Sequence, residues 1–248
     1  MKVSIITICY NSAATIEDTI KSVCSQEYPN VEYIIVDGAS TDRTLEIADR
    51  YRGRIAKVIS EKDKGIYDAM NKGIQAATGD VVGILNSDDY YADERVISDV
   101  VNALTGSGCD GLYADLIYVN REQKNKVVRR WIAGKYQAGM FLGGWMPPHP
   151  TFFVKRHLYH ELGLYNLSLR SAADYELMLR FIHRHHISLV YLPRVITHMR
   201  TGGQSNVSLR NRIRANKEDR AAWRINDLKP AWYTLTLKPV SKLFQYLR

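Results

Sequence analysis

Val3-Ser4-Ile5-Ile6-Thr7-Ile8-Cys9-Tyr10 is the stretch of this sequence that decides the fold. Its apolar and β-branched residues form one continuous run, which is typical of a strand buried on both faces. Asn11-Ser12 interrupts the run, and apolar residues then recur at helical spacing at Ile16, Ile20 and Val23. The chain therefore opens with a strand followed by a helix.

The same alternation continues outward from this run. Further buried strands are predicted at residues 31–36 and 81–85, a short strand at 56–60, and helices after residue 41 and at 66–77. This order predicts an α/β fold with a mostly parallel, doubly wound sheet and helices on both faces. Ligands bind such sheets beyond the carboxyl ends of the strands.

The second half of the chain is less regular. Strands are predicted at residues 111–119, 126–131, 151–154 and 188–192, and helices at 175–183 and 209–223. The Gly- and Pro-rich residues 139–150 are predicted to form a long loop. A length of 248 residues suits one large domain with an appendage. We expect a catalytic domain at 1–206, divided into halves at about 1–90 and 91–206, and an extension at 207–248.

Basic residues are concentrated near the C-terminus. The net charge is +8, but residues 193–248 hold 12 Lys and Arg against 3 Asp and Glu, and the first 192 residues are close to neutral. This asymmetry indicates an anionic partner for the tail and argues against a nucleic-acid-binding protein.

Cysteine use and apolar content indicate the compartment. Three scattered cysteines, Cys9, Cys24 and Cys109, are typical of reduced thiols. The sequence shows neither an apolar run of about 18 residues nor a secretory leader. We therefore expect a cytoplasmic protein.

Acidic residues follow two of the predicted strands. Asp37 closes the second strand, and Asp88 and Asp89 close the fourth. Parallel strands deliver these groups to one edge of the sheet, where adjacent carboxylates repel each other unless they share a cation. Mg²⁺ and Mn²⁺ take carboxylate ligands together with substrate phosphates. The alternative is that the Asp pair caps a helix or shapes a turn.

Four motifs occur in order along the chain. They are Ser4-Ile-Ile-Thr-Ile-Cys-Tyr-Asn11, Val36-Asp-Gly-Ala-Ser-Thr-Asp42, Ser60 to Gly73 (SEKDKGIYDAMNKG), and Gly79-Asp80 followed by Leu85-Asn-Ser-Asp-Asp89. Together they resemble family 2 glycosyltransferases, which have the GT-A fold, a Rossmann-like sheet. The third motif is especially similar to bacterial exopolysaccharide enzymes of the colanic-acid type. The resemblance covers about residues 3 to 205.

The resemblance implies an inverting transfer of a sugar from a nucleotide-sugar, usually a UDP-sugar, to an acceptor hydroxyl in surface polysaccharide synthesis. Asp37 would bind the base. The other expected donor-binding residues are Thr7, Tyr10, Asn11, Ala39, Lys64, Gly65, Asp68, Asn86, Ser87 and Asp88. Lys64-Gly65 precedes a helix, where a turn and a cation can face phosphate; a solvated surface lysine is the alternative. Asp68 and Asn71 are either donor contacts or ordinary helix-surface residues.

The resemblance also implies a divalent metal, Mg²⁺ or Mn²⁺, held by Asp89 and Asp88. A common form of the family has an Asp where this chain has Asn86. This departure leaves Asp89, with Asp88, as the expected metal ligand.

Asp174 matches the catalytic base of the family, at the start of a predicted helix. Ala173 stands where the family often has a Glu. A base that accepts the proton of the acceptor hydroxyl is what inverting transfer requires. A carboxylate at a helix start is otherwise a simple N-cap.

Two histidines are further candidates. His149 lies between prolines in the 139–150 loop, and similar enzymes carry a His beside the acceptor; a loop histidine bonded to backbone is the alternative. His198 follows the last predicted strand, where a structural role is expected over a contact with the metal or diphosphate.

Three rival classes follow from the same residues. A nucleotidyltransferase or a dinucleotide-binding enzyme needs a Gly-rich loop after the first strand, but residues 10–14 contain no glycine. A catalytically inactive glycan-binding or scaffold subunit would be marked by loss of Asp89 or Asp174, and both are present.

The tail combines aromatic and basic residues. Trp223, Trp232, Tyr233 and Phe244 lie among Lys229, Lys238 and Lys242. This mixture suits an anionic membrane surface, at the inner face of the cytoplasmic membrane, where a lipid-linked saccharide acceptor would be found. The alternatives are packing on the catalytic domain and a homodimer contact.

Overall fold

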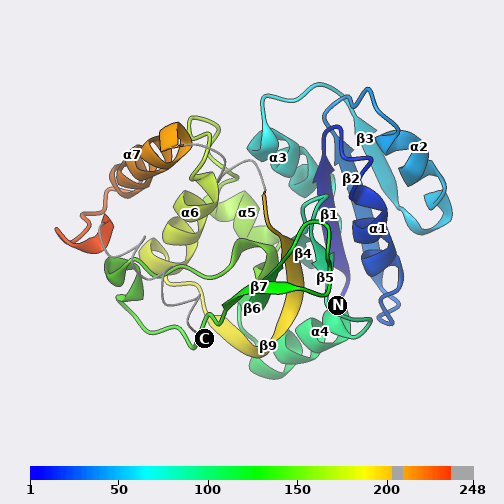
Figure 1. Ribbon diagram of the computed structural model, residues 1–248. Coiled ribbons are helices and arrows are strands. Elements are labelled where there is room, and N and C mark those ends of the chain that lie inside the picture. The colour runs from blue at the N-terminus through cyan, green and yellow to red at the C-terminus, as the bar shows by residue number, and fades with distance from the viewer. Residues whose placement is uncertain (203–208, 236–248) are drawn as a thin grey trace.

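The computed structural model describes residues 1–202 and 209–235 (Figure 1). The strands are β1 (Val3–Cys9), β2 (Val31–Asp37), β3 (Lys57–Ser60), β4 (Val81–Ile84), β5 (Tyr90–Tyr91), β6 (Gly111–Val119), β7 (Val127–Trp131), β8 (Phe153–Lys155) and β9 (Leu189–Arg200). The helices are α1 (Ile16–Cys24), α2 (Thr44–Asp49), α3 (Ile66–Ala76), α4 (Val96–Ser107), α5 (His157–Leu162), α6 (Ala173–Met178) and α7 (Leu209–Ile225). A π-helical turn, Leu179–Arg184, continues α6, and short 3₁₀ turns occupy Arg52–Arg54, Met140–Gly143 and His149–Thr151.

The strands form one sheet in the order β3-β2-β1-β4-β8-β6-β9-β5, with β7 paired to β6. β3, β2, β1 and β4 are parallel neighbours, and β6 and β9 are also parallel. β8 runs antiparallel between β4 and β6, and β5 runs antiparallel to β9. The predicted mostly parallel α/β sheet of the GT-A type is confirmed.

Apolar side chains fill both faces of this sheet. Ile6 and Ile8 of β1 join one core with residues of α3, α5 and α6, whereas Ile5 and Cys9 join the other with residues of α1, α2 and α4. Figure 1 shows α5, α6 and α7 gathered on one side of the molecule and α1 and α2 on the other. Because alternate residues of β1 enter opposite cores, the continuous apolar run is explained.

Three features of the second half differ from the sequence predictions. β9 extends to Arg200, well beyond the predicted strand end at residue 192, because it pairs with β6 along its whole length and with β5 near its end. Helix α4 was not predicted, although Val96, Ile97, Val100 and Leu104 have helical spacing and are all buried. The short helix α5 was also not predicted.

Helix α7 packs against α6 and belongs to the main core. Trp223 is only 1% exposed, and its indole Nε1 donates to the Tyr175 hydroxyl at 2.9 Å. The Asn226 amide donates to Glu176 Oε1 at 3.0 Å. The expectation that Trp223 faces a membrane is therefore wrong; packing on the catalytic domain is what this residue does. Trp232, by contrast, is 91% exposed.

The two tryptophans give a matched stability prediction. Trp223→Ala removes a core side chain and should lower the free energy of unfolding by about 3–5 kcal/mol. Trp232→Ala removes the same side chain from the surface and should change it by less than about 0.5 kcal/mol. Denaturant unfolding of both variants measures the difference. Equal small effects would mean that α7 is not packed as described.

Candidate active site

Three loops meet at the carboxyl ends of β1, β2 and β4. The Ser12 hydroxyl, after β1, lies 2.8 Å from the Ser87 hydroxyl, after β4. The Asn11 backbone N–H donates to the Ser40 hydroxyl, after β2, at 2.8 Å. The predicted donor-side residues of these loops thus come together at the edge of the sheet where α/β proteins bind ligands.

Asp37 organises the loop after β2. Its carboxylate is fully buried and accepts hydrogen bonds from the Ser40 backbone N–H at 3.0 Å and from the Ser60 hydroxyl at 2.8 Å. The Ser40 hydroxyl donates to its other oxygen. In this conformation the carboxylate shapes the loop from inside and offers no surface of its own to a nucleotide base.

The loops after β1 and β2 contain strained backbone and an exposed aromatic ring. Asn11 and Ala39 both adopt left-handed backbone conformations, with φ of 48° and 62°. Such a conformation costs a residue other than glycine roughly 1–2 kcal/mol, and strain of this kind clusters at binding sites. Tyr10 is 60% exposed, and its ring borders Gly38. A flat aromatic face therefore stands open beside the loop that Asp37 holds.

The loop after β4 carries the predicted metal ligands. Asp89 is fully buried; its Oδ2 accepts a hydrogen bond from the Asn86 amide at 3.0 Å. Burial and the neighbouring Asp88 charge hold the pKa of Asp89 well above its usual range. Burial also raises the pKa of Asp88, against the opposing effect of Arg121 and Arg200.

Two oxygens of this loop fit a divalent cation. Asp89 Oδ1 and Asn86 Oδ1 are buried and have no hydrogen-bond partner. Buried oxygens beside a carboxylate pair are the donor set that Mg²⁺ or Mn²⁺ takes. In the described part of the chain, no group of three or more His, Cys, Asp and Glu residues is arranged to hold a metal. A cation held here would take its remaining ligands from substrate phosphate and water.

Arg200, at the end of β9, holds the backbone of this loop. It is buried, and its Nη1 donates to the Asp88 carbonyl at 2.7 Å. Its Nη2 is paired with Asp18 of α1, and the guanidinium lies 4.9 Å from the centre of the Tyr90 ring. Arg200 was not predicted as a site residue. It lies beyond the predicted strand end at residue 192, and its contact with the Asp88 carbonyl joins residues 112 positions apart, so no local pattern indicated it.

The loop before α3 is held by its own acidic residues. The Asp68 carboxylate accepts the Lys64 backbone N–H at 3.0 Å, and Asp63 accepts the Gly65 N–H at 2.8 Å. Gly65 has φ of 117°, a conformation that favours glycine. The Lys64 side chain is exposed at this turn, so it is available to a ligand, whereas Asp68 supports the backbone.

Thr7 and Asn71 have buried side chains that are hydrogen-bonded within the fold. Thr7 is fully buried within β1, and its hydroxyl accepts a hydrogen bond from Tyr33 at 3.1 Å. Asn71 is buried, and its amide both donates to and accepts from the Tyr165 backbone at 2.9 Å. Both side chains hold the fold together in this structure.

A second cluster surrounds Asp174 in the first turn of α6. The Tyr67 hydroxyl donates to Asp174 Oδ1 at 3.2 Å, and the Tyr67 ring stacks on Tyr165 at 5.6 Å between centroids. The Tyr165 hydroxyl lies 2.7 Å from His149 Nε2. Asp174 is half-buried, and the N-terminus of α6 has no side-chain cap. The capping role considered for Asp174 is not observed.

His149 enters this cluster as a partly buried ring. Burial lowers its pKa, although the Asp174 charge acts in the opposite direction. Tyr67 and Tyr165 were missed as members of the cluster; Tyr67 lies within the motif at residues 60–73. His198, in contrast, packs edge-on against Tyr90 with ring centroids 5.0 Å apart, which is a structural contact.

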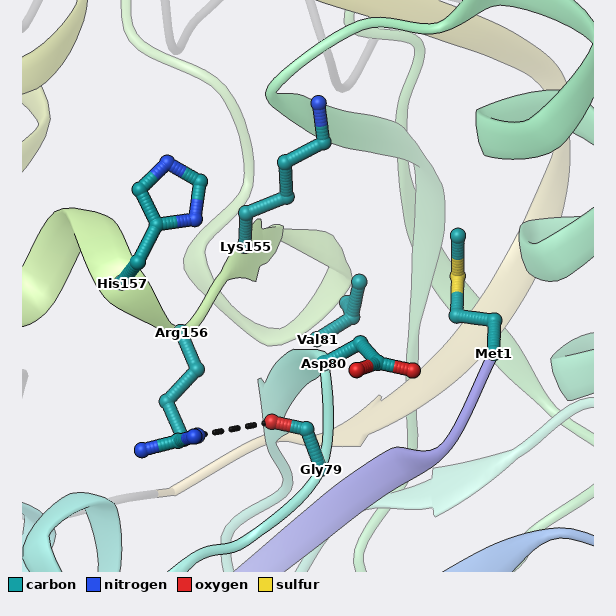
Figure 2. Close-up of a pocket in the computed structure, with 7 residues that line it drawn as sticks. All are labelled: Met1, Gly79, Asp80, Val81, Lys155, Arg156 and His157. Atoms are coloured by element: carbon teal, nitrogen blue, oxygen red, sulfur yellow. Dashed lines mark hydrogen bonds between the residues drawn. The ribbon is translucent and has the colours of Figure 1, made fainter.

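A hollow of about 240 Å³ lies at the opposite edge of the sheet (Figure 2). It is bordered by the start of β4 and by residues 155–157. Arg156 Nε donates to the Gly79 carbonyl at 2.8 Å, and Lys155 pairs with Asp110 at 3.2 Å. Because its cations are already paired and it faces the amino end of β4, this hollow is not the candidate active site.

Solved structures confirm the fold. The TarS 1–349 chain of S. aureus in complex with UDP-GlcNAc superimposes with a TM-score of 0.70 at 19% identity, over 91% of this chain and 65% of that chain. The mannosyltransferase PcManGT from Pyrobaculum calidifontis in complex with GDP-Man and Mn²⁺ gives a TM-score of 0.67 at 18% identity, over 97% of this chain and 69% of that one. This chain thus spans about two thirds of each.

Sequence relatives establish the family. An uncharacterized glycosyltransferase of Mycobacterium tuberculosis is 33% identical over 186 residues, covering 72% of this chain and 68% of the relative. A PGL/p-HBAD biosynthesis glycosyltransferase of Mycobacterium bovis is 30% identical over 209 residues, 82% of this chain and 78% of its own. A putative teichuronic acid biosynthesis glycosyltransferase, TuaG of Bacillus subtilis, is 41% identical over 97 residues, 38% of each chain. The sequence profile named Glycosyl transferase family 2 matches residues 4–164, and this chain belongs to that family.

Proposed function

We propose that this protein is an inverting, metal-dependent hexosyltransferase that moves a sugar from a UDP-sugar to an acceptor hydroxyl during synthesis of a bacterial surface polysaccharide or glycolipid. The observation that carries the proposal is that both carboxylate clusters are tied to the carboxyl ends of parallel strands of the sheet. Asp88 and Asp89 follow β4, and Asp174 is tied by Tyr67 to the start of α3. The names of relatives in glycolipid and teichuronic acid biosynthesis support the acceptor class.

The donor would bind across the loops after β1, β2 and β4. Tyr10 presents an open ring for a base beside Gly38, and the left-handed backbone of Ala39 would line the same loop. Lys64 and Gly65 would face the diphosphate from the turn before α3. TarS structures that hold UDP-GlcNAc or UDP, and PcManGT with GDP-Man, support a nucleotide-sugar donor.

Asp89, Asp88 and the Asn86 carbonyl oxygen would hold the divalent cation. Such a cation, when bound, offsets the charge of a departing diphosphate. Asn86 would supply a neutral oxygen in place of a carboxylate, and Ser87 would line the same loop. The Mn²⁺ in the PcManGT complex supports this choice of metal.

Asp174 would act as the base. It would accept the proton of the acceptor hydroxyl as that oxygen attacks the anomeric carbon opposite the leaving group. His149 would lie on the acceptor side. The 139–150 loop supports this side with Trp145, whose ring stacks on Tyr136 at 5.1 Å between centroids.

A donor panel tests the proposal. UDP-, GDP- and dTDP-sugars are incubated with the full chain, with and without Mn²⁺, and nucleoside diphosphate release is measured beside donor binding. Release of UDP that needs the metal supports an enzyme of this class. Binding without turnover of any donor would instead identify a scaffold subunit.

The tail gives a prediction for membrane association. In the described chain, no helix is both long and apolar enough to cross a bilayer. Trp232 is exposed beside Tyr233, and Lys229 lies nearby in the sequence; Lys238, Lys242 and Phe244 lie outside the described residues. We expect co-sedimentation with anionic liposomes that salt weakens and that Trp232→Ala reduces. Equal sedimentation with neutral and anionic liposomes, or no sedimentation with either kind, would contradict membrane association. A dimer observed without liposomes would favour a protein contact for the tail.

A further inference from the structure

Tyr67 joins the two halves of the catalytic domain at the proposed base. It lies in the first turn of α3, is buried, and donates from its hydroxyl to Asp174 Oδ1 at 3.2 Å. Its ring stacks on the Tyr165 ring. Asn71, one turn further along α3, donates from its side-chain amide to the Tyr165 carbonyl and accepts the Tyr165 backbone N–H. Stacking thus holds the Tyr67 ring against Tyr165, and the two Asn71 hydrogen bonds hold the Tyr165 backbone against α3.

We propose that Tyr67 is a positioning residue that aims the Asp174 carboxylate at the acceptor hydroxyl. The inference rests on the proposed role of Asp174 as the base. A carboxylate is planar, so a hydrogen bond that fixes Oδ1 also fixes the direction of Oδ2. Asp174 lies in a helix of only six residues without a side-chain cap, and its side chain needs an external partner to hold one direction.

Three side chains face Asp174, and they differ in whether they hydrogen-bond to its carboxylate. His149 and Tyr165 interact electrostatically with Asp174, but the Tyr165 hydroxyl is already engaged with His149 Nε2 at 2.7 Å. Burial lowers the pKa of His149, which disfavours the charged form that could pair with the carboxylate. Among these three groups, Tyr67 is the one with a hydrogen bond to Asp174.

Tyr67 is suited to the task because it stays a neutral donor. Burial and the Asp174 charge raise the pKa of its phenol far above the ordinary range. A donor that does not titrate stabilises the ionised carboxylate throughout the working pH range. Loss of that hydrogen bond removes a donor from the ionised carboxylate, so the acid side of the rate profile should move to higher pH.

The test is Tyr67→Phe in the full chain, assayed with the UDP-sugar that supports turnover. A hydrogen bond to a charged group justifies a loss of about ten- to hundred-fold in kcat. The acid limb of the kcat/KM profile for the acceptor should move to higher pH, and the donor KM should stay unchanged. Replacement of Tyr67 by 3-fluorotyrosine, a stronger donor of similar shape, should move the limb to lower pH.

Tyr33→Phe is the matched control. It removes the same atom from a tyrosine whose hydroxyl also makes one buried hydrogen bond, to Thr7 at 3.1 Å, inside the other core. This variant should keep the wild-type rate and pH profile. Two outcomes would overturn the positioning role. In the first, Tyr67→Phe loses rate but the acid limb of its pH profile does not move. In the second, Tyr67→Phe is thermally destabilised and misfolded, and the 3-fluorotyrosine protein shows no shift of the acid limb.

Asp174→Asn separates this inference from the proposed function. If Asp174→Asn loses transfer while Tyr67→Phe keeps its rate and its acid limb, the base assignment stands and the positioning role is wrong. If Asp174→Asn keeps transfer, the base assignment fails and the positioning role fails with it.

Discussion

Asp174→Asn is expected to lower transfer by about 100- to 10,000-fold, the usual contribution of a general base. The amide has nearly the same shape as the carboxylate and can still accept a hydrogen bond from Tyr67, so the cluster should persist. What it loses is the capacity to take a proton. Donor affinity, measured by titration calorimetry with UDP, should be close to the wild-type value because Asp174 lies in the cluster of α6 and not in the loops proposed for the donor.

Asp227→Asn is the control for this change. It makes the same substitution at an exposed carboxylate just beyond α7, whose partner is the Arg184 side chain at 3.3 Å. An exposed ion pair contributes little to stability, so rate and stability should both be preserved. A near-normal transfer rate in Asp174→Asn would remove this residue from the mechanism.

Asp89→Asn is expected to lower turnover by about 100- to 1,000-fold, comparable with the loss of one electrostatic stabiliser of the transition state. The reason is charge: a neutral amide at this position weakens the hold on the cation that offsets the diphosphate. Turnover of the wild type should also stop in excess chelator and return with Mn²⁺. Full activity in chelator would contradict the metal assignment.

Thermal unfolding gives this prediction a second readout. A ligand that binds only the folded state raises the melting temperature. Mn²⁺ should therefore stabilise the wild type and have little effect on Asp89→Asn. Asp49→Asn, at the C-terminal end of α2 in an exposed ion pair with Arg52, should keep the full response to Mn²⁺. An equal Mn²⁺ response in Asp89→Asn would place the metal elsewhere.

The parallel half of the fold was predictable because three of its strands, β1, β2 and β4, are buried on both faces, whereas β3 at the edge is largely exposed. β1, β2 and β4 carry nearly continuous apolar runs, and such runs leave one interpretation. The second half was harder. β9 was predicted to end near residue 192 because its later residues are mixed, with Arg194, His198 and Arg200 each bound to partners that only the folded chain supplies.

The candidate site was predictable where residues are adjacent in sequence and not where contacts span the chain. Asp88 and Asp89 are neighbours at a strand end, and Asp174 matched a family motif. The contact of Tyr67 with Asp174 joins residues 107 positions apart, and that of Arg200 with Asp88 spans 112. Tertiary packing creates these contacts, so no local pattern announces them.

Thr7 is a residue whose predicted role was changed by tertiary packing. Its place in the first motif implied a donor contact, but a residue in the middle of a strand faces one of the two cores. The Tyr33 hydroxyl meets it there. Trp223 likewise belonged to an aromatic, basic tail by composition, and its burial depends on the face of α6 that it meets.

The measurement that tests the central claim most directly is the anomeric configuration of the product, determined by NMR on the glycoside formed from an α-linked UDP-sugar. A base that activates the acceptor hydroxyl opposite the leaving group requires one displacement, and the account therefore predicts a β-linked product. An α-linked product would contradict it, because retention of configuration cannot arise from the single displacement that Asp174 is proposed to assist.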